Sequence, residues 1–124
     1  MLVVENEWAI CQAITRLLSR DGYRVLTAGT GDDAERLLRT EPVTLLLLDL
    51  HLPDVRGDVL YHIATSVRPA LARHTLFMTG DITESAAALI MACGAPMLLK
   101  PFGSEALYRS VDMLLGTRRE ANGS

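Results

Sequence analysis

The sequence lacks the features that would tie it to a membrane or to nucleic acid. No apolar run approaches the roughly 20 residues of a membrane-spanning helix. The start has no basic segment followed by an apolar stretch and a cleavage site. With 15 acidic and 12 basic residues the net charge is −3, which argues against nucleic acid as a direct partner. We therefore expect a domain that makes no membrane contact and binds no nucleic acid directly.

Cysteine and histidine are also scarce. Cys11 and Cys93 each fall within an apolar helical pattern and have no metal-ligand spacing around them. We expect two buried free thiols in a reducing compartment, and hence a cytoplasmic location. His51, His62 and His74 have no ligand spacing either, which argues against an imidazole metal site. A glycine-rich phosphate loop of either common type is absent.

What the chain does contain is a buried-strand pattern that ends in a carboxylate. The four leucines at 45–48 stop abruptly at Asp49, and Pro53 and Gly57 follow. An unbroken apolar run of this kind is typical of a central strand in a parallel sheet with helices on both faces. Asp49 is thus expected at the carboxyl end of a buried strand, where open α/β sheets bind ligands. A carboxylate beside an apolar core is costly unless it is paired, solvated or bound to a metal.

Short apolar segments alternate with helical patterns along the rest of the chain. Further strands are expected at residues 2–4, 23–27, 75–79 and 97–99. A helix follows each of the five strands, and Thr83 and Ser104 are expected to cap the last two. This alternation predicts an α/β fold with a parallel sheet and right-handed crossovers. We expect one domain over residues 1–116 and a polar, flexible tail over 117–124.

Polar side chains stand at the carboxyl ends of four of these strands. Glu5 and Asn6 follow the first strand, Asp49 the third, Thr79 the fourth and Lys100 the fifth. If these ends meet at one edge of the sheet, two carboxylates, an amide, a hydroxyl and an ammonium share one site. Such a site can hold a divalent cation and a phosphoryl group together.

In order and spacing, four segments resemble the receiver domain of two-component response regulators. They are residues 3–7 (VVENE), 48–53 (LDLHLP) with Gly57 beyond, 78–80 (MTG) and 100–102 (KPF). The resemblance implies a flavodoxin-like, doubly wound sheet of five parallel strands in the order 2-1-3-4-5, with five helices. It implies that Asp49 accepts a phosphoryl group from the phosphohistidine of a histidine kinase or a histidine phosphotransfer domain. The domain would not be an enzyme beyond catalysing its own phosphorylation and dephosphorylation.

The resemblance also assigns roles around Asp49. It implies a Mg²⁺ ion held by Glu5 or Asn6, by Asp49 and by the backbone carbonyl of His51. Lys100 would pair with one phosphoryl oxygen, and the Thr79 hydroxyl would bind another and so switch a protein-interaction face. The imidazole of His51 is expected to be solvated.

Two positions depart from the receiver pattern. Asn6 stands where receivers usually carry a second acidic residue, so we expect weak Mg²⁺ binding that depends on Glu5. Met97 stands three residues before Lys100, where many receivers have a switching tyrosine or phenylalanine. A switch that uses Met97 must therefore differ in detail. The methionines at 78, 91, 97 and 113 are expected to fill the core.

Other functions remain open at this point. A degenerate receiver that is never phosphorylated would act only as a binding module, and Asn6 and Met97 favour it. A small aspartyl-phosphate enzyme is disfavoured, because such enzymes commonly have an aspartate where this chain has His51. A homodimer could form through the switching face. The segments at 77–81, 94–96 and 99–102 also look similar to receivers at the end of hybrid sensor histidine kinases.

Overall fold

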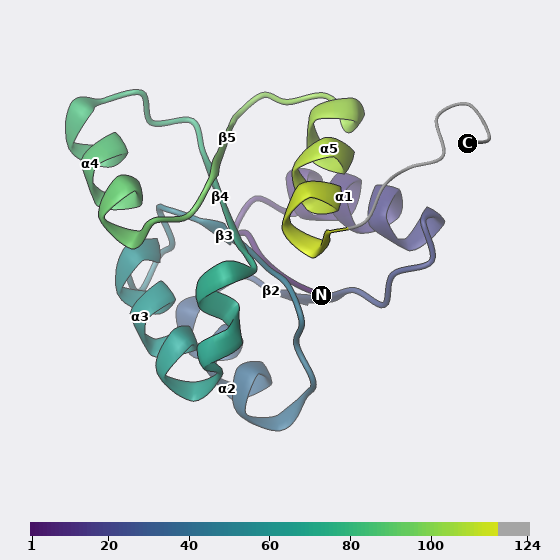
Figure 1. The fold of residues 1–124 in the computed structure, drawn as a ribbon, viewed down its shortest axis with the longest axis horizontal. Coiled ribbons are helices and arrows are strands. Elements are labelled where there is room, and N and C mark those ends of the chain that lie inside the picture. Colours follow the sequence, from purple (N-terminus) through teal and green to yellow (C-terminus); the bar gives the residue numbers. More distant parts are fainter. Residues whose placement is uncertain (117–124) are drawn as a thin grey trace.

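Five parallel strands form one sheet in the order β2-β1-β3-β4-β5 (Figure 1). The computed structural model describes residues 1–116, and the expected tail at 117–124 lies outside the described residues. The strands are β1 Leu2–Val4, β2 Leu26–Ala28, β3 Leu46–Asp49, β4 Thr75–Thr79 and β5 Met97–Leu99. The α-helices are α1 Trp8–Arg20, α2 Gly31–Thr40, α3 Gly57–Val67, α4 Glu84–Cys93 and α5 Ser104–Leu115. This doubly wound, flavodoxin-like arrangement confirms the predicted fold class.

Helices cover both faces of the sheet. α1 and α5 lie side by side on one face, where the Tyr108 hydroxyl donates to the Leu17 carbonyl at 3.1 Å, and α2, α3 and α4 cover the other (Figure 1). Successive strand residues point to opposite faces. Leu47 therefore packs in the core under α1 and α5, whereas Leu48 and Phe77 pack in the core under the other three helices.

β3 lies at the centre of the sheet and places Asp49 at the edge of the core. Leu46, Leu47 and Leu48 have no exposed surface. Burial of each such side chain stabilises the fold by about 1.5–3 kcal/mol, so the register of β3 is firmly set. Asp49 comes next on the same strand and is only 6% exposed.

The chain turns closely around this end of β3 because of Gly57, the first residue of α3. A Cβ atom at this position would lie 2.4 Å from the Asp49 carbonyl oxygen and 2.8 Å from the Leu50 Cα. Both are backbone atoms that cannot move aside cheaply. The Gly57 N–H also donates to the Leu50 carbonyl at 2.6 Å. Glycine thus lets α3 begin directly beside Asp49.

Three local expectations differ from the structure. The second strand was predicted at 23–27 but is Leu26–Ala28, because β1, its one partner, starts at Leu2 in register with Leu26. Residues 23–25 consequently have no strand to pair with.

Gly103, rather than Ser104, is the N-cap of α5, and Ser104 is its first helical residue. A short 3₁₀-helix, Pro69–Arg73, follows α3 and was not expected. Thr83 does cap α4, accepting from the Ala86 N–H at 3.2 Å.

The prediction that all four methionines fill the core is wrong for three of them. Met78 is fully buried, but Met91 is 78%, Met113 75% and Met97 40% exposed. α4 is apolar nearly all round although only Ala86 and Ile90 are buried. Periodicity therefore could not tell which of its apolar residues face solvent.

Both cysteines are free thiols, as expected, but only Cys11 is buried and Cys93 is half-buried. Among residues 1–116, no helix has the length and apolar character needed to cross a membrane.

Candidate functional site

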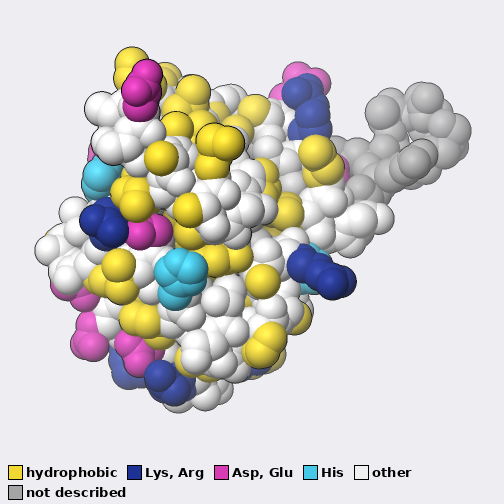
Figure 2. All heavy atoms as spheres, turned by 60° about the vertical axis from the view of Figure 1, so that its left-hand side comes forward, with side chains coloured by type: hydrophobic (Ala, Val, Ile, Leu, Met, Phe, Trp, Pro, Cys, Tyr) yellow, Lys and Arg dark blue, Asp and Glu magenta, His cyan; other side chains and the backbone are white. Residues whose placement is uncertain are grey.

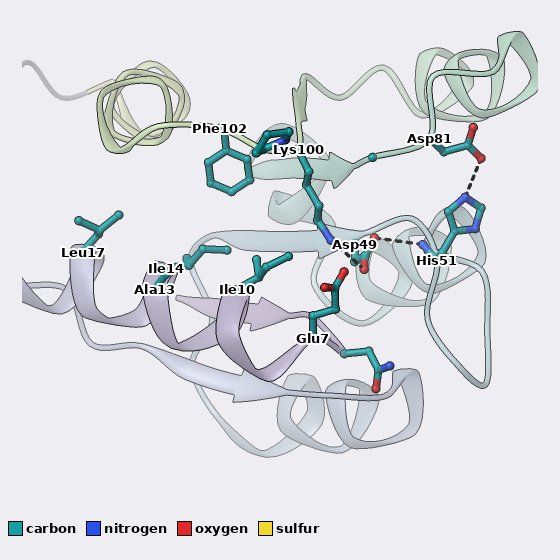
Figure 3. A pocket seen from close by; sticks show the side chains of 13 residues that line it. Glu7, Ile10, Ala13, Ile14, Leu17, Asp49, His51, Asp81, Lys100 and Phe102 are labelled. Atoms are coloured by element: carbon teal, nitrogen blue, oxygen red, sulfur yellow. Dashed lines mark hydrogen bonds and ion pairs between the residues drawn. The ribbon is translucent and has the colours of Figure 1, made fainter.

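A pocket of about 640 Å³ opens at the carboxyl edge of the sheet (Figure 3). Its polar part is lined by Asn6, Glu7, Asp49, His51, Gly80, Asp81 and Lys100. Its apolar part is lined by Ile10, Ala13, Ile14 and Leu17 of α1 and by Pro101 and Phe102 after β5. The pocket therefore joins a charged cluster to an apolar groove along α1.

Lys100 lies between two buried carboxylates at the polar end. Its Nζ is 3.2 Å from Asp49 Oδ2 and 2.5 Å from Glu5 Oε1. The contact with Glu5 is the shorter of the two ion pairs. The Glu5 side chain has no exposed surface, and its Oε2 accepts from the Glu7 N–H at 3.0 Å. β1, β3 and β5 thus contribute to one ionic cluster, as the sequence predicted.

Burial and neighbouring charges shift the pKa values in this cluster. Burial raises the pKa of Asp49, and the negative charge of Glu5 raises it further. The Lys100 charge and the His51 N–H, which donates to Asp49 Oδ1 at 3.2 Å, offset part of this effect. Burial opposes the charged form of Lys100, but Glu5 and Asp49 outweigh it and the pKa of Lys100 is raised. A buried cluster of two carboxylates and one ammonium carries one net negative charge.

Thr79 is fully buried at the end of β4, and its hydroxyl oxygen accepts from the Asp81 N–H at 3.0 Å. It is not among the residues that line the pocket. A hydroxyl that accepts still has its own proton to donate. The side chain would have to turn toward the pocket before it could donate to a group bound at Asp49.

The His51 imidazole is not simply solvated, and the contact it makes was not expected. Its Nε2 lies 2.8 Å from Asp81 Oδ2, which joins the loop after β3 to the loop after β4 (Figure 3). Hydrogen bonds from Thr83, and then from His51, lower the pKa of Asp81 to about 2. The segment at 80–82 carried no sequence pattern that identifies a partner for His51, so Asp81 was missed.

Asp54 holds the loop after β3 in place from the other side. Its Oδ1 accepts from the Gly31 N–H at 2.8 Å and its Oδ2 from the Asp32 N–H at 2.9 Å. These are the first two residues of α2. The side chain satisfies two of the amides that a helix N-terminus leaves unpaired, and these hydrogen bonds lower the pKa of Asp54.

The oxygen donors at this site suit a hard cation. Glu5 and Asp49 offer carboxylates, the Asn6 side chain lines the pocket, and the His51 carbonyl belongs to the loop beside Asp49. Mg²⁺ prefers such oxygen ligands. Glu5 Oε1 is buried and pairs with Lys100 at 2.5 Å, so a cation that used this oxygen would compete with the ammonium. No three His, Cys, Asp or Glu side chains within residues 1–116 are grouped to hold a metal, so a cation would also need the Asn6 amide and the carbonyl.

Met97 lies outside this pocket, on an apolar surface formed by α4 and β5. Apolar side chains gather in the upper part of the face seen in Figure 2, where α4 lies. Exposed members of this α4–β5 surface are Ile82, Met91, Met97 and Leu99. Met97 is therefore partly exposed to solvent and is not among the residues that line the pocket at Asp49.

A doubly wound sheet whose central strand ends in a buried aspartate paired to lysine is the arrangement that the resemblance to receiver domains implies. Residues 1–112 match the response regulator receiver domain family, and the chain belongs to this family. Such domains accept a phosphoryl group in two-component signal transduction, interact with histidine kinases or phosphotransfer proteins, generally bind Mg²⁺ and are generally not classical enzymes.

Relatives and solved structures agree with this assignment. The response regulator receiver protein CpdR of Brucella abortus is 30% identical over 119 residues, covering 93% of this chain and 95% of that protein. A CheY-like receiver domain protein from Methanospirillum hungatei has a TM-score of 0.86 and 26% identity, covering 93% of this chain and 91% of that one.

A response regulator from Burkholderia pseudomallei was solved with a phosphorylated aspartic acid, a calcium ion and citrate. It has a TM-score of 0.79 and 27% identity, and covers 89% of this chain and 64% of that one. The chain spans 25% of the length of the first curated relatives and 49% of another, all transcriptional regulatory proteins.

The raised pKa of Asp49 predicts a pH-dependent stability difference in metal-free buffer. An acid whose pKa is higher in the folded state stabilises the fold below its unfolded pKa, ordinarily 3.8, and loses that contribution as the pH rises through the folded pKa. Asp49→Asn should therefore unfold at higher urea concentration than the wild type at pH 7. The difference should shrink at about pH 4.

Asp54→Asn provides the contrast, because the pKa of Asp54 is lowered. Its stabilisation is present above the unfolded pKa and lost as the pH falls through the folded pKa. This variant should be less stable than the wild type at pH 7. An Asp49→Asn variant that is also less stable at pH 7 would contradict the unfavourable burial of that carboxylate.

Proposed function

We propose that residues 1–116 form a receiver domain in which Asp49 is the phosphoacceptor. The observation that carries this assignment is the buried Asp49 carboxylate, 3.2 Å from the Lys100 ammonium, in a pocket at the carboxyl edge of the sheet. A carboxylate in this position has a cation beside it and opens onto space for a second group. We also retain the cytoplasmic location and the domain limit at residue 116 as predictions.

The reaction proposed is transfer of a phosphoryl group from a phosphohistidine. An Asp49 oxygen attacks phosphorus, a phosphorus–oxygen bond forms, and the phosphorus–nitrogen bond breaks with its electron pair going to the donor imidazole. The transferred group carries dispersed negative charge, so stabilisation of charge is the main task of the site. Lys100 already lies beside Asp49 and can pair with a phosphoryl oxygen. Thr79 would donate to another oxygen after its side chain turns.

A Mg²⁺ ion is proposed at the oxygen donors of Glu5, Asn6, Asp49 and the His51 carbonyl. When bound, it would reduce the repulsion between Asp49 and the incoming phosphoryl oxygens. Both oxygens of the Glu5 carboxylate already have partners, because Oε1 pairs with Lys100 and Oε2 accepts from the Glu7 amide. With an amide at position 6, this donor set has less negative charge than one with two acidic residues, so we expect weak binding.

The apolar part of the pocket is proposed to receive the partner. A phosphohistidine must come close to Asp49, so the partner surface around that histidine must contact the residues that border Asp49. That border is the groove of Ile10, Ala13, Ile14 and Leu17 with Phe102 opposite (Figure 3). An amphipathic helix that carries the histidine would bury its apolar side chains there.

The signal is proposed to leave through the α4–β5 surface. Thr79 ends β4 and its hydroxyl is tied to the loop that leads into α4. A phosphoryl group adds acceptor oxygens that only a displaced Thr79 hydroxyl can reach, so phosphorylation would favour a displaced loop. A partner or a second copy of the domain would read the change at that surface, without an aromatic residue at Met97.

The direct test of the phosphoacceptor is intact-mass measurement after treatment with acetyl phosphate and Mg²⁺. The wild type should gain one phosphoryl group, because a small donor needs no docking surface. Asp49→Asn should gain none. A phosphorylated Asp49→Asn protein would sink the assignment, and an unmodified wild type would favour the passive binding module.

Ala13→Glu tests the docking groove. Ala13 is exposed on α1 and lines the groove, so a glutamate there places charge and bulk against an apolar partner. Transfer from a phosphorylated kinase or phosphotransfer domain should slow by roughly tenfold, about 1.4 kcal/mol, with unchanged acetyl phosphate reactivity. Gln12→Glu adds the same charge to an exposed α1 position outside the groove and should transfer normally. Equal transfer rates in both variants would rule the groove out.

Amide exchange with and without beryllofluoride, a phosphoryl mimic, tests the switch. Protection should change in the loop at 80–83, in α4 and in β5. One or two charge-assisted hydrogen bonds are worth about 1.5–3 kcal/mol each, enough to reverse a modest conformational bias. Thr79→Val, which keeps the shape but removes the hydroxyl, should bind the mimic yet lose the distant changes. Changes confined to the surroundings of Asp49 in the wild type would leave no role for the α4–β5 surface.

A further inference from the structure

Glu7 is an acidic residue at the pocket to which neither the proposed chemistry nor the docking groove gives a role. It stands two residues after Glu5, and its side chain lines the same pocket as Asp49 and Lys100. In Figure 3 its carboxylate points into that pocket. We propose that Glu7 supplies the second acidic group of the Mg²⁺ site, through metal-bound water, in place of the charge missing at Asn6. The inference rests on the metal site proposed above.

The helix that follows makes no use of this side chain. Glu7 is the N-cap of α1, and its side chain makes no capping hydrogen bond. Its backbone carbonyl accepts from the Cys11 N–H at 3.0 Å, so the backbone alone starts the helix. Glutamate is a poor choice for this position, where serine, threonine, aspartate and asparagine are favoured. A role in the pocket therefore explains the glutamate at this position better than a role in capping α1.

The backbone at Glu7 is fixed next to the metal donors. Its N–H donates to Glu5 Oε2 at 3.0 Å, which ties the turn after β1 to the buried carboxylate beside Lys100. The Glu7 side chain is exposed and long, so its carboxylate can reach over a hydrated ion while its own Cα stays in place. The turn consequently offers the buried carboxylate of Glu5 and the solvent-exposed carboxylate of Glu7, with Asn6 between them in the sequence.

Contact through water fits both the geometry and the preference of the ion. No three acidic side chains in the described part of the chain are grouped to bind one ion directly, so we place Glu7 beyond the direct ligands. Mg²⁺ gives up its waters reluctantly and usually keeps several. A carboxylate that accepts hydrogen bonds from those waters orients them and adds attraction without displacing them.

Charge gives the physical reason for a second acidic group. Glu5 and Asp49 contribute two negative charges and Lys100 one positive charge, which leaves a single net negative charge to attract a divalent cation. Glu7 would double that net charge at the mouth of the site. The alternative role for Glu7 is a favourable interaction with the dipole of α1 alone, which would affect helix stability but not metal affinity.

Calorimetric titration of the whole chain with MgCl₂ separates these roles. Glu7→Gln should weaken Mg²⁺ binding roughly tenfold, as expected for loss of a group that hydrogen-bonds to a metal ligand. Glu84→Gln is the matched control, because it makes the same change at the start of α4 and outside the pocket, and it should leave the affinity unchanged. Adding Asn6→Asp to Glu7→Gln moves the charge back by one residue and should restore the affinity. Glu7→Asp keeps the charge and should retain most of the binding, which separates loss of charge from any loss of fold.

Equal Mg²⁺ affinity of the wild type and Glu7→Gln overturns the inference and leaves Glu7 with the helix dipole. Failure of Asn6→Asp to restore binding in the Glu7→Gln background overturns it as well. A different result identifies failure of the underlying metal site: a wild type that binds no Mg²⁺, or an Asp49→Asn variant that binds it as well as the wild type does.

Discussion

The ammonium of Lys100, held between the carboxylates of Asp49 and Glu5, is the contact on which the rest of the candidate site depends. All three side chains are nearly inaccessible to solvent, and Lys100 carries the positive charge that pairs with both carboxylates. Loss of Lys100 would leave both buried carboxylates without this partner, and removing one partner of a buried ion pair typically costs about 3–5 kcal/mol. Loss of the Asp49 carboxylate would still leave Lys100 paired with Glu5. Lys100 is also the only lysine in the sequence. Arginine has a planar, permanently charged guanidinium, and no arginine within residues 1–116 lines the pocket.

Glutamate at position 5 changes how this cluster is built. The additional methylene group lets Oε1 reach Lys100 from β1 while Oε2 remains free to accept from the backbone at Glu7. The same carboxylate thus organises the lysine and the turn that leads into α1. A cation that uses Glu5 has to compete with Lys100 for that oxygen.

The sequence predicted the sheet and its site better than the surroundings of the site. β3 could be predicted because four consecutive leucines have no amphipathic alternative, and β4 was predicted at the residues where it occurs, Thr75–Thr79. The gathering of Glu5, Asp49 and Lys100 followed from parallel topology, because all three stand at carboxyl ends of strands. The start of β2 could not be predicted, since it depends on where β1 begins.

Side-chain contacts between loops were beyond the sequence for a similar reason. The bond from His51 to Asp81 joins residues 30 positions apart, and the bonds from Asp54 reach 23 and 22 positions back to α2. Neither has a local pattern. The prediction that the methionines of α4 and β5 lie in the core was wrong because hydrophobicity alone does not show whether a partner or the core covers a side chain.

Because Asp54 is hydrogen-bonded to the start of α2, the loop after β3 becomes ordered when the domain folds and not when a partner binds. Two hydrogen bonds from one carboxylate, with Gly57 packed on the end of β3, fix both sides of the loop that carries the His51 carbonyl. Fixing a residue of backbone costs about 1–2 kcal/mol of conformational entropy, so ordering a loop of this length at the moment of binding would be expensive. Here the loss occurs when the chain folds. An arriving donor therefore meets a loop that is already in its final shape, and little of its binding free energy is spent on ordering that side of the pocket.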